Sequence, residues 1–179
     1  MIPLQFLAAA LLMELTPGPN MAWLALLSAS RGRAAGFAAT AGIALGLALL
    51  AIAAGVGVAA LMDGRPWLWD AVRIAGFALL AWLAVEAWIT PARGDAPAAS
   101  RWGAFWRGVA VNMLNPKAAA VFALVIPTYA ATAASADAPA AGVLTLSAVY
   151  VAIATLVHAG IVAFGSALSG SLLRPERER

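Results

Sequence analysis

The chain has 179 residues, of which 64% are hydrophobic and 11% are charged, and its mean hydropathy is +0.90. This composition is typical of an integral membrane protein, and the length accommodates several spanning helices with no separate soluble domain. The formal net charge of +3 does not indicate nucleic-acid binding. The absence of cysteine, together with a single histidine, His158, excludes a thiolate metal site, a disulfide frame and a catalytic Cys/His pair.

Apolar segments long enough to cross a membrane follow one another along the chain. About 20 apolar residues cross the hydrocarbon core of a bilayer. The segments cover about residues 4–29, 36–62, 66–90, 108–133 and 140–170. They predict an all-α, polytopic transmembrane helix bundle of about five spans, forming one transmembrane domain over residues 1–179. The N-terminus has no basic region of the kind that precedes a cleaved signal peptide, so we expect no cleavage.

The basic residues between these segments predict the orientation in the membrane. The second connection holds Arg65, and the third segment holds Arg73. The first, third and final connections hold the remaining arginines: Arg31, Arg33, Arg93, Arg101, Arg107, Arg174, Arg177 and Arg179. Because cytoplasmic loops carry the excess of Lys and Arg, we expect an external N-terminus and a cytoplasmic basic tail at residues 174–179.

The first segment is interrupted by Thr16-Pro17-Gly18-Pro19-Asn20. Proline lacks a backbone N–H and clashes with the preceding helical turn, and glycine weakens a helix, so no helix passes through this stretch intact. At membrane depth, non-helical backbone is tolerated only where protein buries it or where it lines a wet cavity. The stretch therefore predicts a broken helix beside a cavity.

A second interruption lies in the fourth segment, at Asn115-Pro116-Lys117. Asn115 suits an N-cap and Pro116 suits the first helical position, so we expect a helix to restart at Pro116. Three segments precede this one, so the two interrupted segments enter the membrane from opposite sides. This arrangement is typical of transporters built from inverted repeats, here with a first half at about residues 1–95 and a second at about 105–170.

Broken helices of this kind predict a site for a zwitterion. A half-helix N-terminus suits a carboxylate, and carbonyls freed near Pro17 and Pro19 suit a cation or an ammonium group. Lys117 adds a positive charge beside the second break, although its stem could also reach the cytoplasmic interface. Asn112 and Asn115 share a helix face, where they serve either substrate contact or helix packing. Trp23 is the tryptophan expected at the cavity wall, and the others predict an aromatic belt at the interfaces.

The two motifs, Thr16-Pro17-Gly18-Pro19-Asn20 and Gly108 with Asn112 and Asn115-Pro116-Lys117, resemble those of the LysE/RhtB family of amino-acid exporters. Pro127 also fits the fourth segment of that family. The resemblance implies a proton-driven efflux permease in a bacterial inner membrane, with an amino acid, protons and the lipid bilayer as partners and no cofactor or metal. Family members usually carry a sixth span, whereas no apolar run follows Pro175, so we expect the last span to be missing. Association with further copies of the chain stays open.

Two ionisable residues are candidates for proton coupling. Glu14 lies near the middle of its span, where an acid costs about 2.5–3.5 kcal/mol and should face the bundle interior or water. Its alternative role is that of a protonated side chain bonded to a neighbour such as Thr16 or Asn20. His158 suits a proton relay, although a lone histidine is more often a packing residue.

Two other classes of function compete with an exporter. A membrane-embedded enzyme would need a nucleophile with a base, or a metal cluster, and the composition supports neither. A non-transporting or partner-dependent accessory protein is favoured by the missing span. A further expectation concerns packing: Gly42 and Gly46 are four residues apart, the spacing that lets two helices approach closely in lipid.

Overall fold

In the computed structural model, all regular structure of the described residues is helical, which confirms the predicted fold class. Most of the third predicted segment, the connection that follows it and the tail at 174–179 lie outside the described residues. The structure describes residues 2–56, 65, 67, 70, 71, 74, 78, 81, 82, 85, 100–133 and 139–172.

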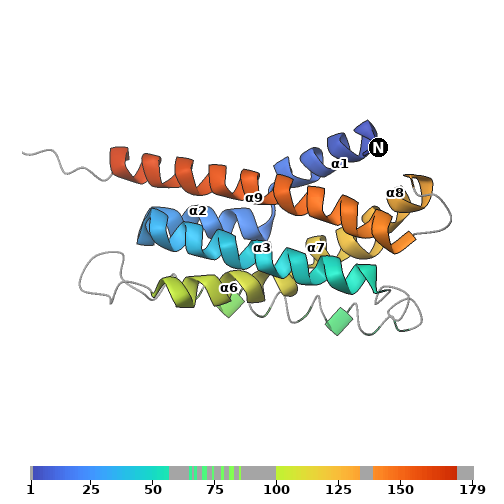
Figure 1. The fold of residues 1–179 in the computed structure, drawn as a ribbon. Helices are drawn as coiled ribbons and strands as arrows, with labels where there is room; N and C mark the ends of the chain where they lie inside the picture. The colour runs from blue at the N-terminus through green and yellow to red at the C-terminus, as the bar shows by residue number, and fades with distance from the viewer. Residues whose placement is uncertain are drawn as a thin grey trace, which may run out of the picture.

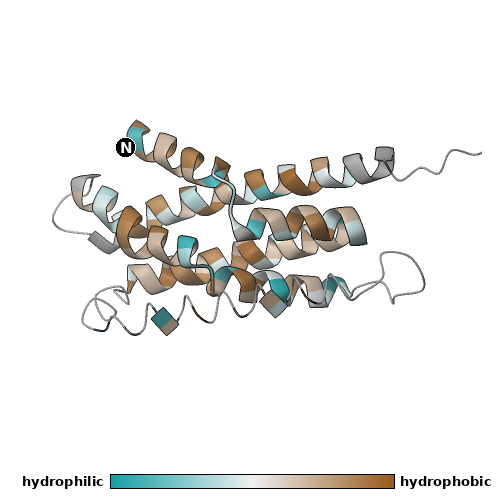
Figure 2. Cartoon of the chain, turned by 180° about the vertical axis from the view of Figure 1, so that it is seen from behind, coloured by the Kyte–Doolittle hydropathy of each residue, from teal (hydrophilic) through white to brown (hydrophobic). Residues whose placement is uncertain are grey.

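The described helices run roughly along one long axis, and α9 extends along nearly its whole length (Figure 1). In chain order the helices are α1 (Leu4–Leu15), α2 (Pro19–Arg31), α3 (Arg33–Gly55), α6 (Arg101–Met113), α7 (Pro116–Ala120), the π-helix η1 (Val121–Val125), α8 (Ile126–Ala133) and α9 (Pro139–Leu172). Most of their residues are hydrophobic, with hydrophilic residues where α1 gives way to α2 (Figure 2).

Two of these helices are long and apolar enough to cross a membrane unaided. They are α3 and the stretch Ala141–Ser166 of α9. A third candidate is the pair formed by Arg101–Met113 and Pro116–Ala131, which is bent by 51° at its break, and α1 is a shorter apolar helix. The described residues therefore contain two or three candidate spans, and the total of about five stays a prediction.

Both interruptions predicted from proline are present in the structure. The first helix ends at Leu15, and the next begins at Pro19, its first helical position. After α6 ends at Met113, the side chain of Asn115 accepts a hydrogen bond of 2.9 Å from the backbone N–H of Lys117. The N-cap at Asn115 and the restart at Pro116 are thus confirmed. The π-helix follows directly and precedes Pro127, which cannot donate to the carbonyl four residues earlier.

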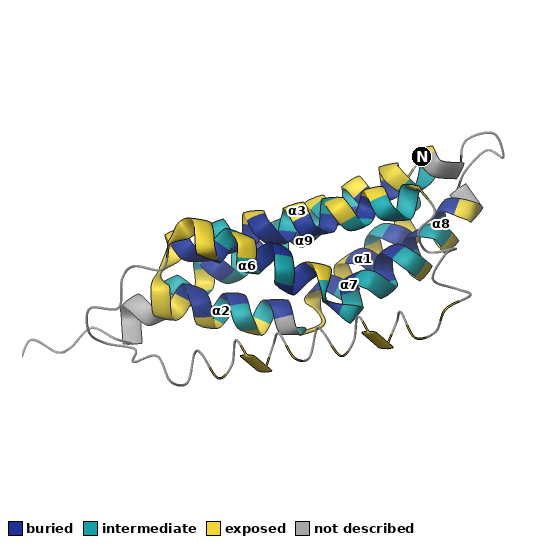
Figure 3. Ribbon diagram, turned by 90° about the horizontal axis from the view of Figure 1, so that it is seen from below, coloured by how far each residue is buried: buried dark blue, intermediate teal, exposed yellow. Residues whose placement is uncertain are grey.

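Glycine lets α3 and α6 cross in close contact. A Cβ atom on Gly42 would collide with the carbonyl of Phe105, and one on Gly108 would collide with the carbonyl of Ala39. At Gly46 a Cβ would lie 3.0 Å from the Cβ of Asn112. The close crossing predicted from Gly42 and Gly46 is therefore confirmed. Buried residues gather on the faces that the helices turn toward one another, and exposed ones lie on the outer faces (Figure 3).

Arginines gather at one end of the molecule. Arg31 closes α2, Arg33 opens α3 and Arg101 opens α6, at the end where α9 also finishes (Figure 1). The N-terminus lies at the opposite end. This arrangement agrees with the predicted orientation, which itself stays a prediction.

The described tryptophans outside α2 are about half exposed or more, as a belt requires, and Trp69 and Trp88 lie outside the described residues. These exposed tryptophans are Trp67, Trp82, Trp102 and Trp106.

Candidate functional site

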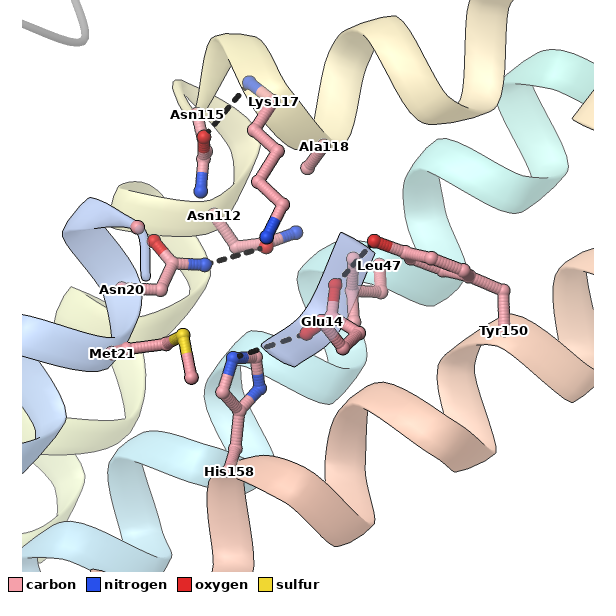
Figure 4. Close-up of a pocket in the computed structure, with 11 residues that line it drawn as sticks. Glu14, Asn20, Met21, Leu47, Asn112, Asn115, Lys117, Ala118, Tyr150 and His158 are labelled. Carbon is pink, nitrogen blue, oxygen red and sulfur yellow. Dashed lines mark hydrogen bonds and ion pairs between the residues drawn. The ribbon is translucent and has the colours of Figure 1, made fainter. Parts of the chain in front are cut away.

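The two helix breaks meet near the middle of the bundle, and a small, partly open cavity lies between them (Figure 4). Its walls come from α1, α2, α3, α6, α7 and α9, so both halves of the chain contribute. The lining residues are Glu14, Gly18, Asn20, Met21, Leu47, Asn112, Asn115, Lys117, Ala118, Tyr150 and His158. Seven of them are residues that the sequence indicated as site candidates.

The remaining candidates are the three prolines at the helix breaks and Trp23. Pro17 and Pro116 are absent from its walls, and the side chain of Pro19 lies outside the described residues. Trp23 was wrongly expected at the cavity wall, because it packs, partly buried, against the hydrophobic core. A helix turns about 100° per residue, so Trp23 points away from Met21, which does line the cavity.

Two buried asparagines join the halves of the chain inside this cavity. The Nδ2 group of Asn20 donates to Oδ1 of Asn112 over 3.1 Å, between residues 92 positions apart. The other amide atoms, Oδ1 of Asn20 and Nδ2 of Asn112, have no hydrogen-bond partner among the described residues. Reversing both amides would leave the same kinds of group unpaired. Since buried polar groups are normally paired, the cavity offers a ligand one acceptor and one donor.

Lys117 reaches from the second break to the first. Its Nζ donates to the carbonyl oxygen of Met13, and it lies 3.2 Å from that of Thr16. In an unbroken helix the carbonyl of Met13 would accept from the residue four positions later, which is Pro17 and has no N–H. The ammonium group therefore replaces the donor that proline removes. Lys117 thus contacts the first helix break and does not extend to the cytoplasmic interface, which was the alternative position for its side chain.

Glu14 is buried, with 5% of its surface exposed, and it contacts two residues of α9. The hydroxyl of Tyr150 donates to Oε1, and Oε2 lies 3.6 Å from Nε2 of His158. The suggested partners Thr16 and Asn20 are wrong, because the former donates to the carbonyl of Leu12 and the latter to Asn112. The donors of Thr16 and Asn20 are therefore directed to partners other than the Glu14 carboxyl.

Tyr150 lines the cavity and was not among the residues expected from the sequence. It is almost fully buried, and its ring meets that of Phe122 edge-on at 5.6 Å. One signal was available, since Tyr150 lies eight residues before His158, a little over two helical turns away and about 80° around the helix, so both side chains can reach one cavity. The other ring nitrogen of His158, Nδ1, has no hydrogen-bond partner among the described residues.

The chemistry of the cavity is that of a polar site enclosed by apolar helices. It holds one carboxyl, one imidazole, one phenol and one ammonium group, together with the unpaired amide atoms. These groups can bind both ends of a zwitterion, and the carboxyl and the imidazole can each exchange a proton. Across the described residues, no three of His, Asp or Glu come together as a metal site would require.

Comparison with known proteins gives this arrangement a context. A sequence model described as the LysE type translocator matches residues 11–179. A homoserine/homoserine lactone efflux protein of Salmonella typhimurium is 28% identical over 128 residues, which are 69% of this chain and 62% of that protein. A leucine efflux protein of Klebsiella pneumoniae is 33% identical over 120 residues, 64% of this chain and 57% of that protein.

An uncharacterized membrane protein of Pseudomonas aeruginosa is 33% identical over 117 residues, which are 60% of this chain and 54% of that protein. The matches thus span a little over half of the length of these relatives. No solved structure shows a significant match.

Proposed function

Because this chain belongs to the LysE type translocator family, we propose that it exports an amino acid or a related small zwitterion across a bacterial inner membrane in exchange for protons. Relatives named as homoserine/homoserine lactone and leucine efflux proteins support export of such a compound. The observation that carries the proposal is the meeting of two helix breaks at one polar cavity, to which both halves of the chain contribute.

The substrate would bind between the two breaks. Gly18, Asn20, Asn112, Asn115 and Lys117 surround this space. Pro17, Pro19 and Pro116 would shape it by ending or starting the helices. The cavity is small, and its polar groups contact one another across it, so entry of an amino acid requires some of these contacts to be exchanged for contacts with the substrate.

Proton exchange would use Glu14 as the carrier, with His158 beside it. A carboxyl buried in an apolar bundle is stable when it is neutral or when partners hold its charge. Here Tyr150 and His158 supply those partners, and all three line the substrate cavity. Protonation of Glu14 would therefore change the contacts of α1 with α9 at the place where the substrate binds. That is the coupling an antiporter needs.

Efflux from vesicles tests this function. Proteoliposomes that contain only this chain are loaded with labelled amino acids, among them leucine, homoserine and threonine, and a pH gradient is imposed. We expect efflux of at least one of these compounds that stops when an ionophore collapses the gradient. Glu14→Gln, which keeps the size of the side chain and removes its exchangeable proton, should abolish the response to the gradient.

The control is Thr145→Ser, which preserves a hydroxyl on the exposed side of α9 and should export normally. Gradient-independent efflux by both the unaltered chain and Glu14→Gln would contradict proton antiport. Absence of efflux for the whole panel from correctly inserted protein would contradict transport by this chain.

A further inference from the structure

Lys117 is the only lysine in the chain, and its ammonium group lies in the space between the broken helices. Its stem passes beside Gly18, where a Cβ would lie 3.7 Å from Cδ. The N-cap at Asn115 and Pro116 start α7 so that Lys117 is its second residue and faces α1. The residues of the second break therefore fix the position of the Lys117 charge.

The sequence explains why the carbonyls that hold the ammonium have no backbone donor. Pro17 removes the donor that the carbonyl of Met13 would otherwise have, and the carbonyl of Thr16 lies in the non-helical stretch before α2. Carbonyls freed at a helix break bind cations. A lysine ammonium presents three N–H donors, and so does the ammonium of an amino acid. The two groups are equivalent donors for this pair of oxygens.

We infer that Lys117 occupies, in the substrate-free state, the subsite that receives the ammonium group of the substrate, and that substrate binding displaces it. This inference rests on the proposed export function. Once released, the Lys117 ammonium is free to pair with the carboxylate of the same substrate. The unpaired Oδ1 of Asn20 then accepts from the substrate ammonium, and the unpaired Nδ2 of Asn112 donates to its carboxylate.

Selectivity for zwitterions follows from this exchange. An amine without a carboxylate would release Lys117 without giving it an anionic partner. An acid without an ammonium would draw Lys117 away and leave the carbonyl of Met13 without a donor, which is unfavourable for a buried polar group. Only a molecule with both charges satisfies both partners. Glu14, His158 and Tyr150 face the same cavity from α1 and α9, so the exchange takes place in the cavity that the proposed proton carrier also lines.

Truncation of the lysine tests the subsite without any measurement of transport. Lys117→Ala removes three methylene groups and the ammonium, which together correspond to n-propylammonium. We expect n-propylammonium to raise the melting temperature of the purified variant by at least about 2 °C at saturation, because a ligand stabilises the state that it binds. The unaltered chain should not respond, since Lys117 fills the subsite.

Two compounds control for the nature of the interaction. The alcohol n-propanol has the same stem without the charge, and tetramethylammonium has the charge without N–H donors, so neither should stabilise Lys117→Ala. Three outcomes would contradict the proposed subsite. They are equal stabilisation of Lys117→Ala and the unaltered chain by n-propylammonium, equal stabilisation of Lys117→Ala by n-propylammonium and tetramethylammonium, and no response of folded Lys117→Ala to n-propylammonium. Recovery of folded Lys117→Ala only when n-propylammonium is present would support it.

Displacement is measured on the unaltered chain. Protein grown with [ε-13C]lysine gives one lysine signal in the NMR spectrum, that of Lys117. An exported amino acid should shift this signal saturably. At equal concentration, n-propylammonium or butyrate alone should shift it at least tenfold less. An unmoved signal in a chain that exports the same amino acid would overturn the inference and leave the proposed function intact. If n-propylammonium stabilises Lys117→Ala but the unaltered chain exports none of the amino acids, the ammonium subsite would be supported and the proposed export function contradicted.

Discussion

At the scale of single residues, the site is assembled by side chains that compensate for broken backbone. Pro17 removes one N–H donor, and Lys117, 104 residues away from Met13, supplies another to the same carbonyl. Asn20 and Asn112 form a second link between the halves. These links are more than local capping, because each joins one broken helix to the other. A change in either partner should therefore alter the relative position of the breaks.

Tyr150 provides a prediction at this scale. Tyr150→Phe removes the hydroxyl that donates to Glu14 and preserves the ring contact with Phe122. Loss of a hydrogen bond to a buried carboxyl should cost about 1–3 kcal/mol. We expect a lower melting temperature, measured in detergent, and export reduced about tenfold or more at an unchanged pH gradient.

Tyr129→Phe is the matched variant, since it removes the other tyrosine hydroxyl of the chain, away from the cavity, and keeps a ring at the edge contact with Phe6. Whatever its effect on melting temperature, it should retain export. Similar losses of export in both variants would contradict a specific role for the hydroxyl of Tyr150.

At the scale of elements, the bundle depends on contacts made through glycine. The crossing of α3 and α6 brings backbone against backbone at Gly42 and Gly108, and Gly46 makes room for Asn112. In lipid, close van der Waals packing of this kind is a main source of helix association. The same crossing sets the position of Asn112, so packing and site geometry are linked on one helix face.

Gly108→Ala should disrupt this crossing. Its new methyl group would meet the carbonyl of Ala39, and overpacking of a tight contact costs about 1–3 kcal/mol or more. Gly160→Ala is the matched control, because a Cβ there has no neighbour within 4 Å. Alanine favours helix over glycine by about 0.5–1 kcal/mol, so this variant should be unchanged or slightly stabilised. Thermal unfolding in detergent distinguishes them, and equal stability of the two would contradict the observed crossing.

At the scale of the whole molecule, two interrupted helical runs meet halfway along a bundle with basic residues at one end (Figure 1). The 23 residues of α3 extend about 34 Å, enough to cross a hydrocarbon core of about 30 Å. The ends of α3 should therefore lie on opposite sides of the membrane. The cavity would then lie near the bilayer midplane, where the proposed alternating access requires it.

Cysteine labelling tests this orientation, since the chain has no cysteine of its own. Ser30→Cys lies at the basic end, and Val56→Cys lies just beyond the other end of α3; both positions are exposed. By the distribution of arginine, a membrane-impermeant maleimide should label Val56→Cys in intact cells and Ser30→Cys only in inside-out vesicles. The reverse pattern would show that the N-terminus lies in the cytoplasm.

Sequence alone determined the features that are local. The apolar composition required a helical membrane protein, and the prolines required breaks at Thr16 to Pro19 and at Asn115, because a missing N–H and a fixed φ act within one helical turn. The cap at Asn115 and the glycine spacing at Gly42 and Gly46 are local in the same sense. Each of these predictions depends on residues a few positions apart, and each is present in the structure.

Only the tertiary structure decided which groups meet. The bond from Tyr150 to Glu14 joins residues 136 positions apart, and that from Lys117 to the carbonyl of Met13 joins residues 104 apart. Such contacts depend on how each helix is rotated about its axis and how far it is shifted against its neighbours. Two residues along a helix, a rotation of about 200°, separate Met21 at the cavity wall from Trp23 against the core. Helix rotation arises from the summed packing of the bundle and has no signal in a short stretch of sequence.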